Sequence, residues 1–167
     1  MGVWEKPGGA DGSRSFVVKI SFIRGGNAMS KVAVVYWTGT GNTGMMAEGV
    51  AEGAKAAGAE VTVLGPSQFS AGDVASYDAI AFGCPAMGAE VLEEGEFEPM
   101  FSAVEGVLAG KKVGLFGSWG WGEGVWMQDW ESRCTADGAK VAGTVICQNA
   151  PDDGALEECR ALGRVLA

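Results

Sequence analysis

The chain has 167 residues, of which 47% are hydrophobic and 20% are charged, enough apolar material for one well-packed domain. It contains no histidine, which excludes imidazole metal sites, Ser-His triads and Cys-His nucleophile pairs, and no apolar run is long enough for a transmembrane helix. The first 28 residues carry a formal charge of +2 and the remainder −11, so the main part of the chain repels nucleic acid and anionic membranes and favours basic protein partners.

The first 28 residues differ in composition from the rest of the chain. They are rich in glycine and contain one short apolar run, Ser15 to Ile23, which Lys19 interrupts. This run is too short for a signal peptide, and no small-residue cleavage pattern follows it. We therefore expect residues 1–28 to be an N-terminal extension that is disordered or a wrongly assigned start, with translation beginning at Met29. A single domain is expected over residues 29–167.

From Lys31 onward the chain repeats a short apolar run, a loop and a segment with helical spacing. Each apolar run is continuous, as in strands that are covered on both faces. The five predicted strands are Val32 to Trp37, Val61 to Leu64, Ala79 to Gly83, Val113 to Ser118 and Val141 to Gln148. Apolar residues three and four positions apart predict helices over Met46 to Ala57, Phe97 to Leu108, Trp126 to Cys134 and Leu156 to Leu166. The stretch Glu60 to Asp78 shows no clear helix after its strand.

This alternation of strands and helices predicts an α/β fold with a five-stranded parallel sheet. Because crossovers between parallel strands are right-handed, the sheet should be doubly wound, with helices on both faces. In a sheet of strand order 2-1-3-4-5, ligands bind beyond the carboxyl ends of the strands, where the order reverses. We therefore expect the ligand site in the loops after the first, third and fourth strands.

The cysteines suit a reducing compartment. They are widely spaced, form no CxxC pair and lie in apolar runs, which is typical of reduced core thiols in a cytoplasmic protein rather than of a disulfide framework. The four positions are Cys84, Cys134, Cys147 and Cys159.

The strongest motif follows the first strand and reads Thr38-Gly39-Thr40-Gly41-Asn42-Thr43, directly before a helical segment. Glycines let backbone N–H groups converge, the helix adds its positive end, and the threonine hydroxyls add donors, so the loop suits a phosphate. It lacks the lysine of a Walker A loop. With Gly44 it also matches the dinucleotide pattern GxGxxG, but no ribose-binding acid ends the second strand. A phosphomonoester such as FMN therefore fits better than NAD, and a tight turn without ligand remains the alternative.

The loops after the third and fourth strands combine large flat or polarizable side chains with glycines that permit close backbone approach. A planar ring could be held between them, next to the phosphate loop. Their residues are Cys84-Pro85-Ala86-Met87-Gly88-Ala89-Glu90 and Ser118-Trp119-Gly120-Trp121-Gly122-Glu123-Gly124.

Four blocks of sequence in this order resemble the flavodoxins, specifically the short-chain clostridial type, from about Lys31 to the C-terminus. The fifth predicted strand runs on without the long insertion of the long-chain members. The blocks are Val35 to Thr43, Gly83 to Gly88, Glu93 to Pro99 and Phe116 to Gly122.

The resemblance implies a low-potential one-electron carrier that uses non-covalently bound FMN between its semiquinone and hydroquinone states, and it implies no catalytic residue and no metal site. The FMN phosphate would bind the threonines, Asn42 and backbone amides of the loop Thr38 to Thr43. Met87 would lie on the inner face of the flavin ring, Trp121 on its outer face, and Glu90 would accept the ring N3–H. In the family, the peptide after the position of Gly88 turns over when the flavin takes one electron.

Two residues depart from the family pattern. Pro85 replaces a hydroxyl residue that some relatives use against the phosphate. Ala89 stands where Asp, Asn or Gly is frequent, so we expect Ala89→Gly to stabilise the semiquinone if the turned peptide needs positive φ there.

Acidic residues near the expected ring site predict a strongly reducing hydroquinone, because like charges raise the free energy of an anionic flavin. They also predict redox partners with basic docking surfaces and, since a carrier must expose its flavin edge, a monomer. These residues are Glu90, Glu93, Glu94, Glu96 and Glu123. The alternative function is a flavodoxin-like FMN-dependent quinone or NAD(P)H oxidoreductase, which would need a substrate pocket.

Overall fold

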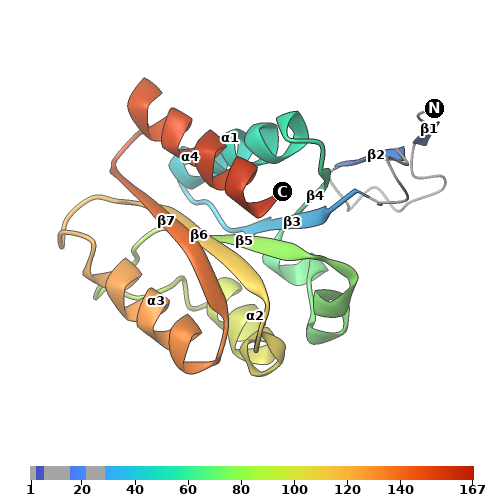
Figure 1. The fold of residues 1–167 in the computed structure, drawn as a ribbon. Coiled ribbons are helices and arrows are strands. Elements are labelled where there is room, and N and C mark those ends of the chain that lie inside the picture. The colour runs from blue at the N-terminus through green and yellow to red at the C-terminus, as the bar shows by residue number, and fades with distance from the viewer. Residues whose placement is uncertain (1–2, 6–15, 22–28) are drawn as a thin grey trace.

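A computed structural model describes residues 3–5, 16–21 and 29–167. Five parallel strands form the centre of its sheet, in the spatial order β4-β3-β5-β6-β7 (Figure 1). This is the predicted order 2-1-3-4-5. The strands are β3 (Lys31–Tyr36), β4 (Glu60–Leu64), β5 (Ala79–Gly83), β6 (Lys112–Trp119) and β7 (Lys140–Gln148).

Helices cover both faces of the sheet, as predicted. Figure 1 shows α1 (Asn42–Ala56) and α4 (Asp153–Leu166) on one face, and α2 (Phe97–Val104) and α3 (Val125–Ala136) on the other. The crossover without a clear helix contains two short 3₁₀ helices, Pro66–Gln68 and Ala71–Ser76, and a third, Glu105–Val107, follows α2.

The strands separate two hydrophobic cores. Along β3, Val32 and Val34 pack with α1 and α4, whereas Ala33 and Val35 pack on the opposite face with α2 and α3. All four side chains are fully buried. Because successive strand residues point to opposite faces, a strand buried on both sides needs the continuous apolar run seen in the sequence.

Strand β7 departs from that expectation because it forms the edge of the sheet next to β6. Most of its side chains are exposed or half-buried, and Ile146 is 40% exposed. Its apolar run therefore does not reflect burial on both faces. The register between β6 and β7 also shifts at Val113/Gly114, which introduces an irregularity into this edge.

Two further strands extend the sheet beyond β4. Strand β2 (Phe16–Ser21) pairs antiparallel with β4, and β1 (Val3–Glu5) pairs antiparallel with β2, so the sheet formed by the described residues has seven strands. The expected five-stranded parallel sheet is thus the core of a larger mixed sheet. The remaining residues of the N-terminal segment, 1–2, 6–15 and 22–28, lie outside the described residues, and the interpretation of this segment as an extension or a wrongly assigned start stays a prediction.

Helices α1 and α4 touch through glycines. A Cβ on Gly53 of α1 would overlap the carbonyl oxygen of Arg160 and lie 2.6 Å from its carbonyl carbon. A Cβ on Gly163 of α4 would overlap the carbonyl oxygen of Val50 and lie 2.7 Å from the amide nitrogen of Ala54. The two backbones therefore approach more closely than any side chain at these positions would permit.

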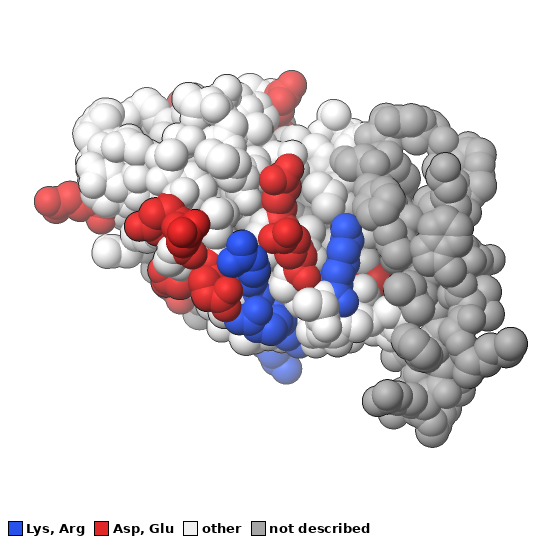
Figure 2. Space-filling model, turned by 90° about the horizontal axis from the view of Figure 1, so that it is seen from above, with Lys and Arg blue, Asp and Glu red and all other residues white. Residues whose placement is uncertain are grey.

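The exposed charges of these two helices include ion pairs between the helices and within α4. Figure 2 looks onto their face and shows basic side chains beside acidic ones. Arg160 pairs with Glu52 of α1 at 3.3 Å and with Glu157 at 3.2 Å, and Arg164 pairs with Glu157 at 2.6 Å. Surface pairs of this kind contribute little to stability, so the close helix contact rests mainly on the glycines.

The four cysteines are free. Cys84, Cys134 and Cys159 are buried core residues, as predicted, whereas Cys147 is only half-buried, because it lies on the edge strand β7. Burial raises the pKa of Cys84, Cys134 and Cys159 to about 12, so these thiols stay protonated at neutral pH. Among the helices of the described segments, none is long and apolar enough to cross a membrane.

Candidate functional site

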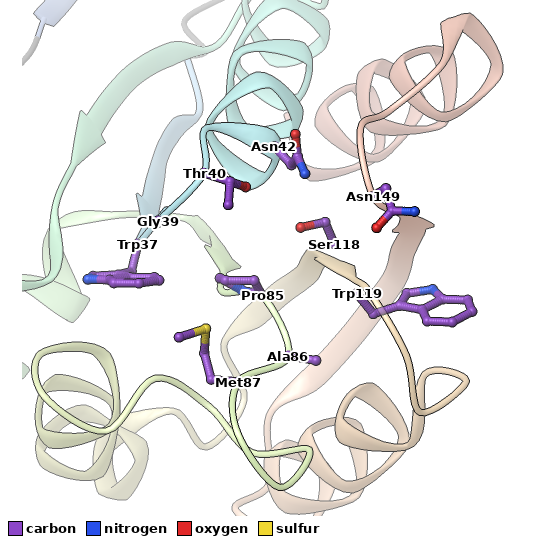
Figure 3. A pocket seen from close by; sticks show the side chains of 11 residues that line it. Trp37, Gly39, Thr40, Asn42, Pro85, Ala86, Met87, Ser118, Trp119 and Asn149 are labelled. Atoms are coloured by element: carbon purple, nitrogen blue, oxygen red, sulfur yellow. The ribbon is translucent and has the colours of Figure 1, made fainter.

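A pocket of about 230 Å³ opens at the carboxyl ends of the parallel strands (Figure 3). It is lined by the phosphate loop after β3, the loop after β5, the end of β6 and the loop after β7. No charged side chain is among its lining residues, which are Trp37, Gly39, Thr40, Asn42, Pro85, Ala86, Met87, Ser118, Trp119, Gly120 and Asn149.

The phosphate loop is held in shape by its own first residue. The hydroxyl oxygen of Thr38 accepts hydrogen bonds from the N–H groups of Gly41, at 3.1 Å, and Gly44, at 3.3 Å. Gly41 has a φ of 98° and open space where a Cβ would stand. Gly41 itself offers no side-chain cap, and Thr38 engages only the Gly44 N–H within the first turn of α1, so the N–H groups of Asn42 and Thr43 remain available to an anion.

Thr43, which was expected to bind the phosphate, points into the protein instead of into the pocket. It is 1% exposed, and its Oγ1 lies 3.3 Å from Oγ of Ser118 and accepts a long hydrogen bond of 3.4 Å from the Ser118 N–H. Thr43 therefore joins the phosphate loop to the end of β6. Ser118 lines the pocket, whereas Thr38, Gly41 and Thr43 are not among the lining residues.

The loop after β5 continues the hydrogen bonding of the sheet beyond the strand. The Cys84 N–H donates to the Phe116 carbonyl and the Ala86 N–H donates to the Ser118 carbonyl, both at 3.0 Å. Trp126 of α3 donates its indole N–H to the Cys84 carbonyl at 3.1 Å. Pro85, Ala86 and Met87 are thereby held against the pocket from below.

Residues 87–91 form a turn closed by two backbone hydrogen bonds between Met87 and Val91, of 2.9 and 3.0 Å. Positive φ occurs at Gly88 (49°) and Glu90 (62°), and Ala89 is not among the residues with positive φ. In this conformation Ala89 therefore carries no strain that glycine would relieve. The expected effect of Ala89→Gly stays a prediction for the reduced state.

The carboxylate of Glu90 is turned inward. Its Oε1 is buried and has no hydrogen-bond partner among the described residues. It packs against Gly122, where a Cβ would overlap the carboxylate and lie 2.8 Å from Cγ of Glu90. A buried carboxylate oxygen without a donor is costly, and a ligand N–H placed there would satisfy it.

Nine of the seventeen sequence-predicted site residues line the pocket. Besides Thr38, Gly41 and Thr43, the residues that do not line it are Gly88, Ala89, Glu90, Trp121 and Gly122. Met87 is 36% exposed at its rim, and Trp121 is 69% exposed on the loop after β6. Met87 is thus accessible from the pocket, whereas Trp121 is exposed outside the pocket lining, and the enclosure of a ring by the two side chains stays a prediction.

Sequence reasoning missed two lining residues, Trp37 and Asn149. Trp37 follows β3 directly, and its indole lies against Gly39, where a Cβ would be 3.0 Å from the ring. Asn149 follows β7 with a φ of 58°, and its N–H donates to the Trp119 carbonyl at 2.8 Å. The polar pair Gln148-Asn149 before Pro151 was the available signal for a turn at this edge.

One of the acidic residues expected near the ring site also stabilises the start of a helix. The Glu93 carboxylate accepts the N–H groups of Gly95, Glu96 and Phe97 at 2.7, 2.7 and 2.8 Å, directly before α2. Burial opposes the ionisation of this carboxyl, but the three donors outweigh it and lower the Glu93 pKa. Glu93 therefore acts as the cap of α2 as well as contributing charge.

We expect Glu93→Ala to lower the free energy of unfolding by about 1–2 kcal/mol, because three backbone donors lose their acceptor. Since the folded pKa lies below its ordinary value of 4.5, this stabilisation is complete above that pH and is lost as the pH falls through the lowered pKa. Urea unfolding at pH 7 and at pH 3 measures both effects. Glu94→Ala, at the exposed neighbouring position, is the control, and an equal loss of stability there would contradict the assignment.

Comparison with known proteins agrees with this geometry. The flavodoxin family model matches residues 34–163. The flavodoxin of Megasphaera elsdenii is 48% identical over 136 residues, which cover 81% of this chain and 98% of that protein. The flavodoxin of Clostridium beijerinckii is 44% identical and is covered to 97%, by 80% of this chain.

Solved structures show the same similarity in three dimensions. The solution structure of the two-electron reduced Megasphaera elsdenii flavodoxin superposes with a TM-score of 0.76, over 81% of this chain and 97% of the other. The crystal structure of oxidised flavodoxin 1 from Bacillus cereus, 26% identical, superposes with a TM-score of 0.72 over 82% of this chain and 97% of the other.

Proposed function

The chain belongs to the flavodoxin family and is an electron carrier of that type, and from this premise we propose that residues 29–167 bind one FMN at the carboxyl edge of the sheet. The observation that carries the proposal is the start of α1 behind a hydroxyl-rich glycine loop, where Thr38 leaves the N–H groups of Asn42 and Thr43 free for an anion. Such a loop suits a terminal phosphate, and because no charged side chain is among the described residues that line the pocket, backbone dipoles would hold it.

The flavin ring would lie between the turn 87–91 and the loop after β6. Met87 would contact one face of the ring and Trp121 the other, since Met87 lines the pocket (Figure 3) and Trp121 is exposed on the loop after β6. Glu90 supplies the buried acceptor that a ring N–H would satisfy. Thr38 would act mainly by shaping the loop, because its hydroxyl oxygen is already engaged with two N–H groups of the loop.

Bound FMN supplies the ability to accept and release electrons one at a time. The protein would determine how readily it gives them up: carboxylates near the ring raise the free energy of an anionic flavin and therefore favour a strong reductant. The same charges would attract partners with basic docking surfaces. The free cysteines fit a cytoplasmic location, and an open ring edge fits a monomer that meets several partners.

Titration of the flavin-free protein with FMN and with riboflavin tests the proposal. We expect FMN to bind with its fluorescence quenched and riboflavin, which lacks the phosphate, to bind at least about a hundredfold more weakly, since several phosphate contacts are lost. Equal affinity for the two would contradict a phosphate site in the loop. Failure of both to bind would contradict the proposal as a whole.

The alternative, an FMN-dependent oxidoreductase, makes a different prediction. An oxidoreductase of this type would oxidise NADH or NADPH, or reduce a quinone, with repeated turnover. We expect the FMN-loaded protein to show no such turnover on its own and to pass electrons only when a reductase and an acceptor protein are added. Turnover with NAD(P)H or quinone alone would favour the alternative.

A further inference from the structure

A second cavity, of about 140 Å³, lies between α3 and the segment that follows Met87. It shares no lining residue with the pocket of Figure 3. Six of its lining side chains are charged or carry a polar atom: Glu90, Glu98, Trp126, Asp129, Trp130 and Arg133. Glu90 therefore lines this cavity. Its carboxylate packs against Gly122, which belongs to the loop after β6 where the flavin ring is proposed to lie.

Two of these groups are already paired. Arg133 donates two hydrogen bonds to the Glu98 carboxylate, at 2.8 and 2.7 Å, and two more to Glu105, at 2.8 and 2.9 Å. The guanidinium therefore has its acceptors, and Glu98 has its donors. Trp126 has a separate acceptor in the Cys84 carbonyl, which leaves Glu90, Asp129 and Trp130 as the other polar groups of the cavity.

Trp130 has an unmet donor. Its side chain is 2% exposed, and its indole Nε1 has no hydrogen-bond partner among the described residues. The neighbouring Trp126 shows the ordinary arrangement, since its indole donates to the Cys84 carbonyl. Buried indole N–H groups usually find an acceptor, so the cavity beside Trp130 is where one should be.

The residue with the unmet acceptor, Glu90, lines the same cavity. Oε1 of Glu90 is buried without a partner among the described residues, and a carboxylate can accept about four hydrogen bonds in total, so a flavin N–H would leave positions free. At roughly 30 Å³ per water molecule, the cavity has room for several waters. A water needs both donors and acceptors around it, and this cavity offers both.

We propose that ordered water in this cavity accepts the indole N–H of Trp130 and donates to the Glu90 carboxylate, so that Trp130 is a positioning residue for the carboxylate that meets the flavin. This inference rests on the proposed FMN site. Trp130 is itself held by edge-to-face contacts with Phe97 and Phe101, at ring-centroid distances of 5.5 and 5.8 Å. Through the water, the rigid core behind α3 fixes the orientation of Glu90.

The test is Trp130→Phe, which removes the N–H and keeps an aromatic ring. We expect FMN to bind about three- to tenfold more weakly, as for the loss of one water-mediated hydrogen bond. In a Glu90→Ala background the same substitution should have no further effect, because it acts through Glu90. An unchanged affinity, or an equal loss in both backgrounds, overturns the proposal.

Phe101→Leu is the matched control, since it disturbs the same aromatic cluster and leaves the indole N–H in place. Its FMN affinity should stay within about twofold of the wild type even if its stability falls. A loss equal to that of Trp130→Phe would mean that core disruption explains both and would overturn the proposal.

A second measurement does not depend on flavin. In the flavin-free protein, the indole proton of Trp130 should show a nuclear Overhauser contact to long-lived water, and the absence of that contact overturns the proposal. If the wild type fails to bind FMN although this contact is present, the proposed function fails while the hydrated cavity stands.

Discussion

Gly53→Ala should lower the free energy of unfolding by at least about 3 kcal/mol, a large share of the roughly 5–15 kcal/mol that stabilises a domain of this size. The added Cβ would overlap the carbonyl oxygen of Arg160 and lie 2.6 Å from its carbon, both part of the rigid backbone of α4. The helices must separate to admit it, which opens the core between α1, α4 and the sheet. The gain in helix propensity, about 1 kcal/mol, is too small to offset this.

Urea unfolding of the flavin-free protein measures this effect, with Gly72→Ala as the control. Gly72 has open space where a Cβ would stand and no positive φ, so its substitution should change the free energy of unfolding by less than about 0.5 kcal/mol. A loss of less than about 1 kcal/mol for Gly53→Ala would show that the helices can shift freely. An insoluble or unfolded Gly53→Ala protein would agree with the prediction.

Gly122→Ala should weaken FMN binding by about ten- to a hundredfold, the loss expected for one charge-assisted hydrogen bond. Its Cβ would occupy the space of the Glu90 carboxylate. Because that carboxylate ends a flexible side chain, we expect Glu90 to swing away rather than the loop to unfold. The flavin ring would then lose its buried acceptor, while the phosphate loop remains intact.

Backbone strain is the competing explanation, since Gly122 has a φ of 96° and alanine there costs about 1 kcal/mol. Gly110→Ala is the matched control, because Gly110 has a φ of 77° and nothing within 4 Å of a Cβ. It should lose similar stability without any change in FMN affinity. If Gly122→Ala binds FMN as tightly as Gly110→Ala does, Glu90 is not an acceptor for the ring.

The parallel core of the sheet could be predicted because burial on both faces forces a continuous apolar run, as in Ala79–Gly83. The same rule failed for β7, whose apolar run lies at an edge. Which strand forms an edge depends on the spatial order, and local sequence does not encode that order. The two 3₁₀ helices after β4 escaped prediction because their three and six residues are too few for a periodic pattern.

The phosphate loop could be predicted because its chemistry is local: glycines, hydroxyls and a helix start follow one another in the chain. Trp37 and Asn149 could not, because they join the pocket only through the neighbouring positions of β3, β5, β6 and β7. Glu93 shows a further limit. Its charge was visible in the sequence, but the three backbone donors that engage it depend on how the chain turns into α2.

The loops around the pocket are bonded to one another without help from a ligand. Thr43 contacts Ser118, Ala86 donates to the Ser118 carbonyl, and Asn149 donates to the Trp119 carbonyl. A ligand that enters such a preorganised site does not have to order these loops and so avoids that entropic penalty. The cofactor should therefore exchange by simple entry and exit, with a single-exponential association whose rate rises in proportion to flavin concentration and shows no plateau from a slow closing step.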